Sequence, residues 1–116
     1  MAFTLDQQII FAVRARNLEL VMERIEAGGD LNYQDSMYGS ALVSAINNGD
    51  EVILQFLIDS GADVNAENVH GIVPLETALH QANRNIVRKL SWSGAKLKSR
   101  SRPHWKELLE ACLNDN

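Results

Sequence analysis

The chain contains three histidines and one cysteine, the residue types that most often bind metals or act as nucleophiles. His70, His80 and His104 form no His-x-x-x-His pair, and none of them stands beside Cys112 in the sequence. Ligands of zinc sites often recur at such short spacing. We interpret the histidines as solvated or partner-facing imidazoles, and Cys112 as a small core residue.

The acidic residues and the glycines give no catalytic pattern either. The acids that stand where caps and turns are expected are Asp35, Asp50, Asp59 and Asp63. The glycines are spaced as helix stops and not as a phosphate-binding loop. We therefore expect no catalytic site, no metal and no cofactor, and we expect that the chain is not an enzyme.

Length and composition fit one folded domain. The chain has 116 residues, of which 46% are hydrophobic and 22% are charged. A single cysteine excludes an internal disulfide, and no apolar run reaches the roughly 18 residues of a membrane span. No Lys or Arg precedes the first apolar stretch, so we expect no secretory signal and a cytoplasmic location.

Charge is distributed unevenly along the chain. Residues 1–83 have a formal charge of −9 and residues 84–116 one of +5, which together give the −4 of the whole chain. This balance argues against a chain covered with basic residues that coat nucleic acid. The basic end could still meet phosphate groups or an acidic protein surface.

A period of 33 residues runs through the sequence. Within each period the apolar spacing predicts two helices followed by a loop. The clearest series at this period are Gly28, Gly61 and Gly94; Ile9, Leu42, Leu75 and Leu108; Ala12, Ala45, Ala78 and Ala111; and Asp35 and Asn68.

Local signals place the ends of several helices. Thr4-x-x-Gln7 predicts a capping box that starts a helix at about Leu5, and Pro74 suits a first helical position. We predict one domain over residues 1–116, with repeats at about 5–33, 34–66 and 67–99 and a capping helix at about 103–114.

Three stretches carry a family resemblance. Gly61-Ala-Asp-Val-Asn-Ala66 resembles the joint between ankyrin repeats, Gly71-Ile-Val-Pro-Leu75 resembles the turn that opens a repeat, and residues 49–58 resemble its second helix. The resemblance covers about residues 5–100. It implies an all-α ankyrin-repeat solenoid of stacked helix-turn-helix units with β-turn fingers, and a role in binding proteins.

The sequence departs from the ankyrin pattern between the helices of two repeats. The usual glycine is replaced by Arg16 and by Ala82, and a left-handed backbone is unfavourable at both residues. We therefore expect Asn17 or Asn83 to adopt that conformation instead. We also expect Trp92 to cover an incompletely apolar core beneath the last outer helix.

The resemblance implies that partners bind at the finger tips and on the inner helices. The fingers supply Met37, Tyr38, Val69, His70, Ile72, Arg102, His104 and Trp105, and the inner helices supply Asn47, Asn48, His80 and Gln81. Tyr, Trp, Met and Arg are enriched at interfaces. We expect the apolar members to follow one edge. The alternative is that Tyr38 and Ile72 pack finger against finger and that Trp105 closes the cap.

The function we infer is a protein–protein interaction module that binds, and in one version inhibits, a partner protein. One alternative is an immunity or antitoxin-type inhibitor whose acidic face blocks a basic effector such as a nuclease. A second alternative is a scaffold that recruits a partner without inhibiting it. A third is a protein that binds an anionic ligand, nucleic acid or lipid, through its basic C-terminal end. Nucleic acid is the less favoured partner. We expect a monomer, with dimerisation through the C-terminal end left open.

Overall fold

The computed structural model describes residues 2–114, and most of them are helical. The chain consists of two compact units, and the boundary between them lies between Asp63 and Val64. The elements are α1 (Leu5–Arg14), α2 (Leu18–Glu26), β1 (Gln34–Asp35), β2 (Gly39–Ser40), α3 (Ala41–Asn48), α4 (Glu51–Asp59), α5 (Pro74–Gln81), α6 (Arg84–Trp92) and α7 (Pro103–Asn114).

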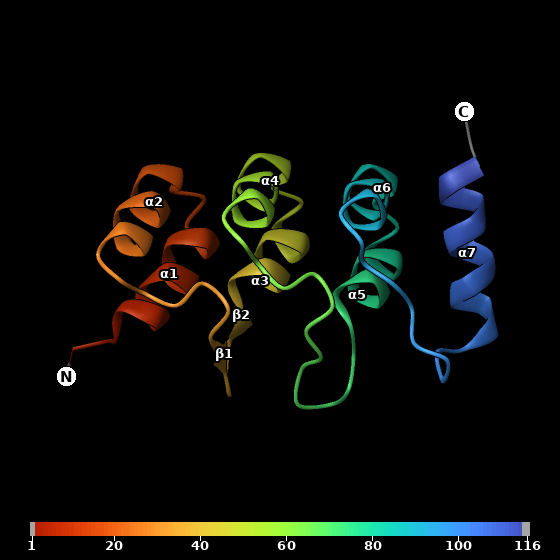
Figure 1. The fold of residues 1–116 in the computed structure, drawn as a ribbon, viewed down its shortest axis with the longest axis horizontal. Coiled ribbons are helices and arrows are strands. Elements are labelled where there is room, and N and C mark those ends of the chain that lie inside the picture. Colours follow the sequence, from red (N-terminus) through yellow and green to blue (C-terminus); the bar gives the residue numbers. More distant parts are fainter. Residues whose placement is uncertain (1, 115–116) are drawn as a thin grey trace. The chain divides into compact units, whose positions relative to one another are not determined.

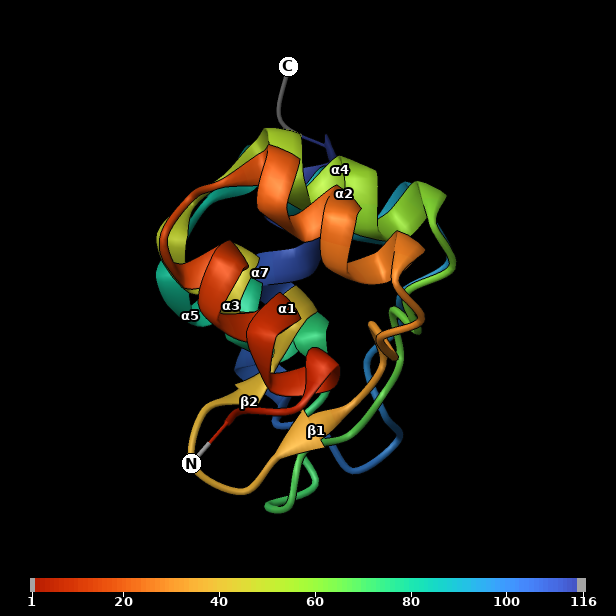
Figure 2. The same ribbon diagram turned by 90° about the vertical axis from the view of Figure 1, so that its left-hand side faces the viewer.

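The first unit contains two helix pairs and a short hairpin. Helix α1 packs against α2 and α3, and α3 packs against α4. Figures 1 and 2 show α1 and α3 side by side, with the β1–β2 hairpin extending from them. The side chains buried between these helices recur at helical spacing. The largest of them are Ile9, Ile10, Val13, Val21, Ile46, Ile53, Leu54 and Leu57.

The second unit contains one helix pair and the last helix. Helix α7 packs against both α5 and α6 and lies beside them in Figure 1. The core includes Leu75, Ile86, Val87 and Leu90. Cys112 is a free, buried cysteine on the inner face of α7, which confirms its predicted place in the core.

Side chains at the helix starts explain the element boundaries. Thr4 accepts from the Gln7 N–H, and the Gln7 side chain accepts from the Thr4 N–H, so the predicted capping box is confirmed. Ser40 caps α3 in the same way, through the Val43 N–H. Pro74 occupies the start of α5, as predicted, and no side-chain cap is formed there.

The backbone between paired helices differs from the prediction. Arg16 and Ala82 themselves adopt the left-handed conformation, with φ of 59° and 56°, as Gly49 does in the middle repeat. Asn17 and Asn83 are in extended or intermediate conformations because each caps the following helix through its side-chain oxygen. The asparagine is required as a cap, so the turn falls on the residue before it.

Ala82→Gly is expected to raise the free energy of unfolding by roughly 0.5–1 kcal/mol. Removing the Cβ relieves a left-handed strain of about 1–2 kcal/mol, and the greater freedom of glycine in the unfolded chain offsets part of it. The control is Ala111→Gly, exposed in the last turn of α7, which is expected to lower the same free energy by up to about 1 kcal/mol. Urea unfolding measures both, and equal losses in the two variants would contradict the assignment.

Candidate protein-binding surfaces

The hairpin formed by residues 34–40 is organised by one carboxylate. Strands β1 and β2 pair antiparallel, with Gln34 opposite Ser40. The Asp35 carboxylate is almost fully buried and accepts from the backbone N–H of Met37 at 2.8 Å and of Tyr38 at 3.1 Å. The turn that carries the predicted contact residues Met37 and Tyr38 is therefore held by hydrogen bonds to a side chain of the hairpin itself.

The same carboxylate joins the hairpin to α1. Asp35 also accepts from the side-chain amide of Gln7 and from the hydroxyl of Tyr33, each at 3.2 Å. The backbone N–H of Met37, followed by the other donors, holds the pKa of Asp35 below its ordinary value. Burial and the neighbouring Asp35 charge raise the pKa of Tyr33. Asp35 is thus a structural carboxylate, as its predicted role in a turn requires.

Met37 and Tyr38 differ in how they meet solvent. Met37 is 78% exposed, whereas Tyr38 is 37% exposed. The Tyr38 ring lies edge-to-face with Phe11, with the centroids 5.1 Å apart, and the Arg14 guanidinium carbon lies 5.0 Å from its centroid. In the first unit, therefore, Tyr38 packs on α1 and keeps part of its ring accessible.

Two phenylalanines that the sequence analysis did not select extend this surface. Phe3 is 56% exposed, and its ring centroid lies 4.7 Å from that of Phe11, again edge-to-face. The Gln8 side chain donates to the Phe3 carbonyl at 2.8 Å. The spacing of Phe11 and Arg14 on one helix face was the available signal, but the partner residue Tyr38 is 27 positions away from Phe11.

The inner-helix asparagines have unequal roles. Asn48 donates through its side-chain amide to the carbonyls of Val13 and Arg14 near the end of α1, and its own carbonyl accepts from Arg16 at 2.8 Å. Asn48 therefore joins α3 to the carbonyl end of α1, where the Val13 carbonyl also accepts from the Arg16 N–H. Asn47 is exposed at the end of α3.

The loop 64–73 of the second unit, like the hairpin, is held by a side-chain oxygen that accepts from backbone N–H groups. The Asn68 side-chain oxygen accepts from the backbone N–H of His70 at 2.8 Å and of Ile72 at 3.0 Å. Asn68 lies 33 positions after Asp35 and also closes its turn with a side-chain oxygen, but its second donor is four residues on, whereas that of Asp35 is three residues on. Val69, His70 and Ile72 are all exposed, Val69 by 78%.

An ion-pair cluster ties this loop to the segment after α6. The Glu67 carboxylate pairs with Lys98 and with Arg100, the latter at 2.8 Å. The Lys98 hydrogen bond is the largest influence that holds the pKa of Glu67 below its ordinary value. Arg88 donates through Nε to the Cys112 carbonyl at 2.9 Å. Part of the basic end thus stabilises its own unit.

The last predicted contact residues lie partly on a helix. His104 and Trp105 belong to the first turn of α7, so their assignment to a finger loop was wrong, because Pro103 starts the helix. The half-buried Trp105 ring lies 4.4 Å from the His104 ring and 6.2 Å from the His80 ring on α5, measured between centroids. Gln81 and Arg102 are exposed at the adjacent helix ends.

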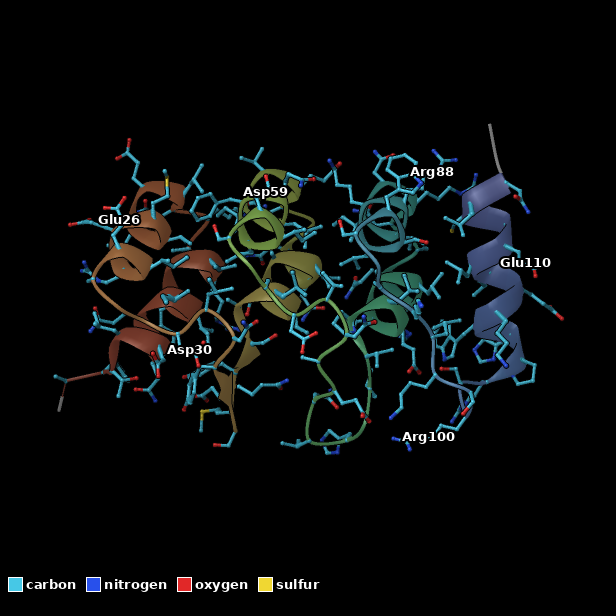
Figure 3. The ribbon with its side chains drawn as sticks, in the orientation of Figure 1. Glu26, Asp30, Asp59, Arg88, Arg100 and Glu110 are labelled. Atoms are coloured by element: carbon cyan, nitrogen blue, oxygen red, sulfur yellow. The ribbon has the colours of Figure 1, made fainter. Side chains whose placement is uncertain are left out.

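Trp92 does not cover the core. It is 77% exposed at the end of α6, so that expectation was wrong. Two residues correspond to about 200° around a helix, which places Trp92 opposite the buried Leu90. Figure 3 shows Arg88 on the same helix, beside α7.

Two structural features are absent from residues 2–114. No group of three or more His, Cys, Asp or Glu side chains is placed to hold a metal ion. No helix in this part of the chain combines the length and the apolar character that crossing a membrane requires.

Helix pairs with intervening turns at a period of 33 residues define a helical repeat protein, and its exposed turns define the candidate site. A family model described as ankyrin repeats in three copies matches residues 9–101. The chain belongs to the ankyrin-repeat family, which is a non-catalytic protein–protein interaction module. The predicted family and all-α solenoid class are thereby confirmed.

Several other proteins are similar in sequence to this region of the chain. The chain is 32% identical to the Arabidopsis thaliana potassium channel AKT1 over 65% of its length, and 32% identical to the Drosophila melanogaster ARF GTPase-activating protein Git over 74%. It is 31% identical to the mouse ankyrin repeat and SAM domain-containing protein 6 over 72%. These matches span only 9%, 12% and 10% of the respective relatives.

Proposed function

We propose that the chain binds a partner protein through its finger tips and inner helices. The observation that carries this proposal is the exposure of Met37 on a hairpin that Asp35 holds in one conformation. A large apolar side chain in water is unfavourable, and a backbone that is held in advance reduces the entropy lost on binding. Tyr38 adds a partly exposed aromatic ring beside it.

The loop of the second unit supplies a second patch of the same kind. Val69 and Ile72 are exposed apolar side chains on a turn closed by Asn68, with His70 between them. We include His80, Gln81, Arg102, His104 and Trp105 in this part of the proposal, since they lie at the ends of α5 and α7. Each unit can be tested by its own variant.

Inhibition of a basic effector would depend on the acidic charge of the first unit. Residues 1–63 contain ten Asp and Glu against three Lys and Arg, which would complement a basic effector. Many of these acids belong to the outer helices α2 and α4, where Figure 3 shows Glu26 and Asp59. The hairpin surface itself is apolar and aromatic. We therefore propose binding as the function and treat inhibition as an outcome to be measured.

The experiment is a pull-down from a native lysate with single variants of each patch. Met37→Asp and Val69→Asp test the two turns, and Val52→Asp is the matched control because Val52 is 66% exposed on the outer helix α4. We expect to capture one protein in stoichiometric amount. Val52→Asp should retain it, and a finger variant should reduce the captured amount about tenfold or more. Circular dichroism verifies that every variant folds.

Other outcomes of the pull-down decide against the proposal. A partner that both finger variants retain would move the binding surface away from the turns. Nucleic acid recovered alone and released by salt would favour the basic end as an anionic-ligand site. Where a partner enzyme is captured, its activity with increasing amounts of the chain distinguishes an inhibitor from a scaffold.

A further inference from the structure

Three rings and one guanidinium form a continuous row on the first unit. Phe3 packs on Phe11, Phe11 packs on Tyr38, and Arg14 lies over Tyr38, with successive separations of 4.7, 5.1 and 5.0 Å. We propose that this aromatic row binds an acidic, apolar peptide segment of the partner protein. The proposal rests on the proposed function and names the chemistry of the partner at the hairpin.

The row is held in place before any partner arrives. Gln8 fixes the Phe3 carbonyl, and the Thr4 capping box fixes the start of α1. Asp35 fixes the backbone of Tyr38. Edge-to-face rings held in this way offer a rigid apolar surface, and little side-chain entropy remains to be lost on binding. An apolar side chain of the partner is the complement of Phe3 and of the accessible part of Tyr38.

Arg14 gives the row its charge preference. Arg14 is exposed and its guanidinium lies over the Tyr38 ring, and among residues 2–114 it forms no ion pair with a carboxylate. A guanidinium held on an aromatic face is well placed to donate two parallel hydrogen bonds to a carboxylate. A lysine or arginine of the partner at that point would instead be repelled.

Two acids of this unit, on α1 and on the hairpin, accept hydrogen bonds from within the unit. Asp6 accepts from the Asp30 N–H at 2.7 Å. Asp35 is surrounded by four donors and is almost fully buried. The excess negative charge of residues 1–63 includes the acids of α2 and α4, on the outer side of the unit (Figure 3). Arg14 is thus the charged side chain that contacts the row directly.

A selection from a library of random twelve-residue peptides tests the proposal on the full chain. The wild type is expected to enrich Asp or Glu at a fixed spacing from an aromatic or aliphatic residue. Selection on Arg14→Glu is expected to replace that acid by Lys or Arg. For the most enriched peptide, synthesised and titrated, Arg14→Glu and Phe3→Ala are each expected to lower affinity about tenfold.

A charge swap in the peptide separates direct pairing from general effects. Replacing its selected acid by lysine should weaken binding to the wild type and restore binding to Arg14→Glu, as a double-mutant cycle requires. Lys106→Glu makes the same change in sign on exposed α7, and Val52→Ala removes apolar surface on α4. Both controls should bind the peptide as the wild type does, and circular dichroism checks the folding of all four variants.

Several results would overturn this proposal. Peptides enriched without an acid preference, or with a preference that Arg14→Glu leaves unchanged, would show that Arg14 does not select the partner. If the library yields nothing while the pull-down finds a partner lost in Met37→Asp, the partner chemistry is wrong and the proposed function stands. Failure of both the library and the pull-down would remove the proposed function as well.

Discussion

Leu54→Ala is expected to lower the free energy of unfolding by about 2–5 kcal/mol. Leu54 is fully buried on α4, so the substitution removes apolar contacts and leaves a cavity that the packed helices fill only in part. Folded domains are stable by about 5–15 kcal/mol, and this loss is therefore a large share of the total. Equilibrium unfolding in urea, followed by far-ultraviolet circular dichroism, measures it.

Val52→Ala is the matched control on the same helix. Val52 lies two residues before Leu54 and is 66% exposed, because two residues carry the side chain to the other face of α4. Its truncation is expected to change the free energy of unfolding by at most about 0.5 kcal/mol. Similar losses in the two variants would contradict the burial of Leu54.

Leu54→Ala also tests the proposal that residues 1–116 form one domain. Both tryptophans, Trp92 and Trp105, belong to the second unit, whereas Leu54 belongs to the first. If neighbouring repeats unfold together, Leu54→Ala shifts the fluorescence transition as much as the dichroism transition. A fluorescence transition that stays at the wild-type midpoint would instead identify two independently unfolding units and overturn the single-domain proposal.

The helices could be predicted because their signals are local. The capping box at Thr4 and the proline at position 74 act within one turn of each helix start. The repeat period added the equivalence of Asp35 and Asn68, which close corresponding turns with the same kind of oxygen acceptor. These features need no knowledge of packing between distant residues.

The missed features depend on competition or on tertiary contact. Propensity alone disfavours a left-handed Ala82, but the requirement for Asn83 as a cap outweighs it. The exposure of Trp92 follows from the phase of α6, which the buried Leu90 sets. The aromatic row was missed because Phe3 and Phe11 become a surface only when the distant Tyr38 folds onto α1.

Asp35→Ala is expected to abolish the ordered hairpin and with it most partner binding through the first unit. The carboxylate is the shared acceptor for the backbone N–H groups of Met37 and Tyr38 and for the side chains of Gln7 and Tyr33. Without the carboxylate these donors lose their common acceptor. Met37 and Tyr38 must then become ordered when the partner binds, and the entropy lost in that step weakens the affinity. Affinity for a captured partner should fall at least about tenfold.

The order of the hairpin should also depend on pH, and the sign follows from the lowered pKa of Asp35. A carboxyl that is more acidic in the folded chain than in the unfolded chain contributes fully above its ordinary pKa of 3.8. That contribution is lost as the pH falls through the lowered folded pKa. Amide exchange of Met37 and Tyr38, corrected for the intrinsic pH effect, should therefore accelerate only on the acid side.

Asp35→Asn separates the acceptor from the charge. Asn68 closes the equivalent turn of the second unit with an amide oxygen, so an amide at position 35 should also hold the N–H groups of Met37 and Tyr38. We expect the asparagine variant to keep the hairpin and most partner affinity, but to lose the acid-side change in amide exchange because its amide does not titrate. An asparagine variant as disordered as Asp35→Ala would show that the negative charge itself organises the hairpin.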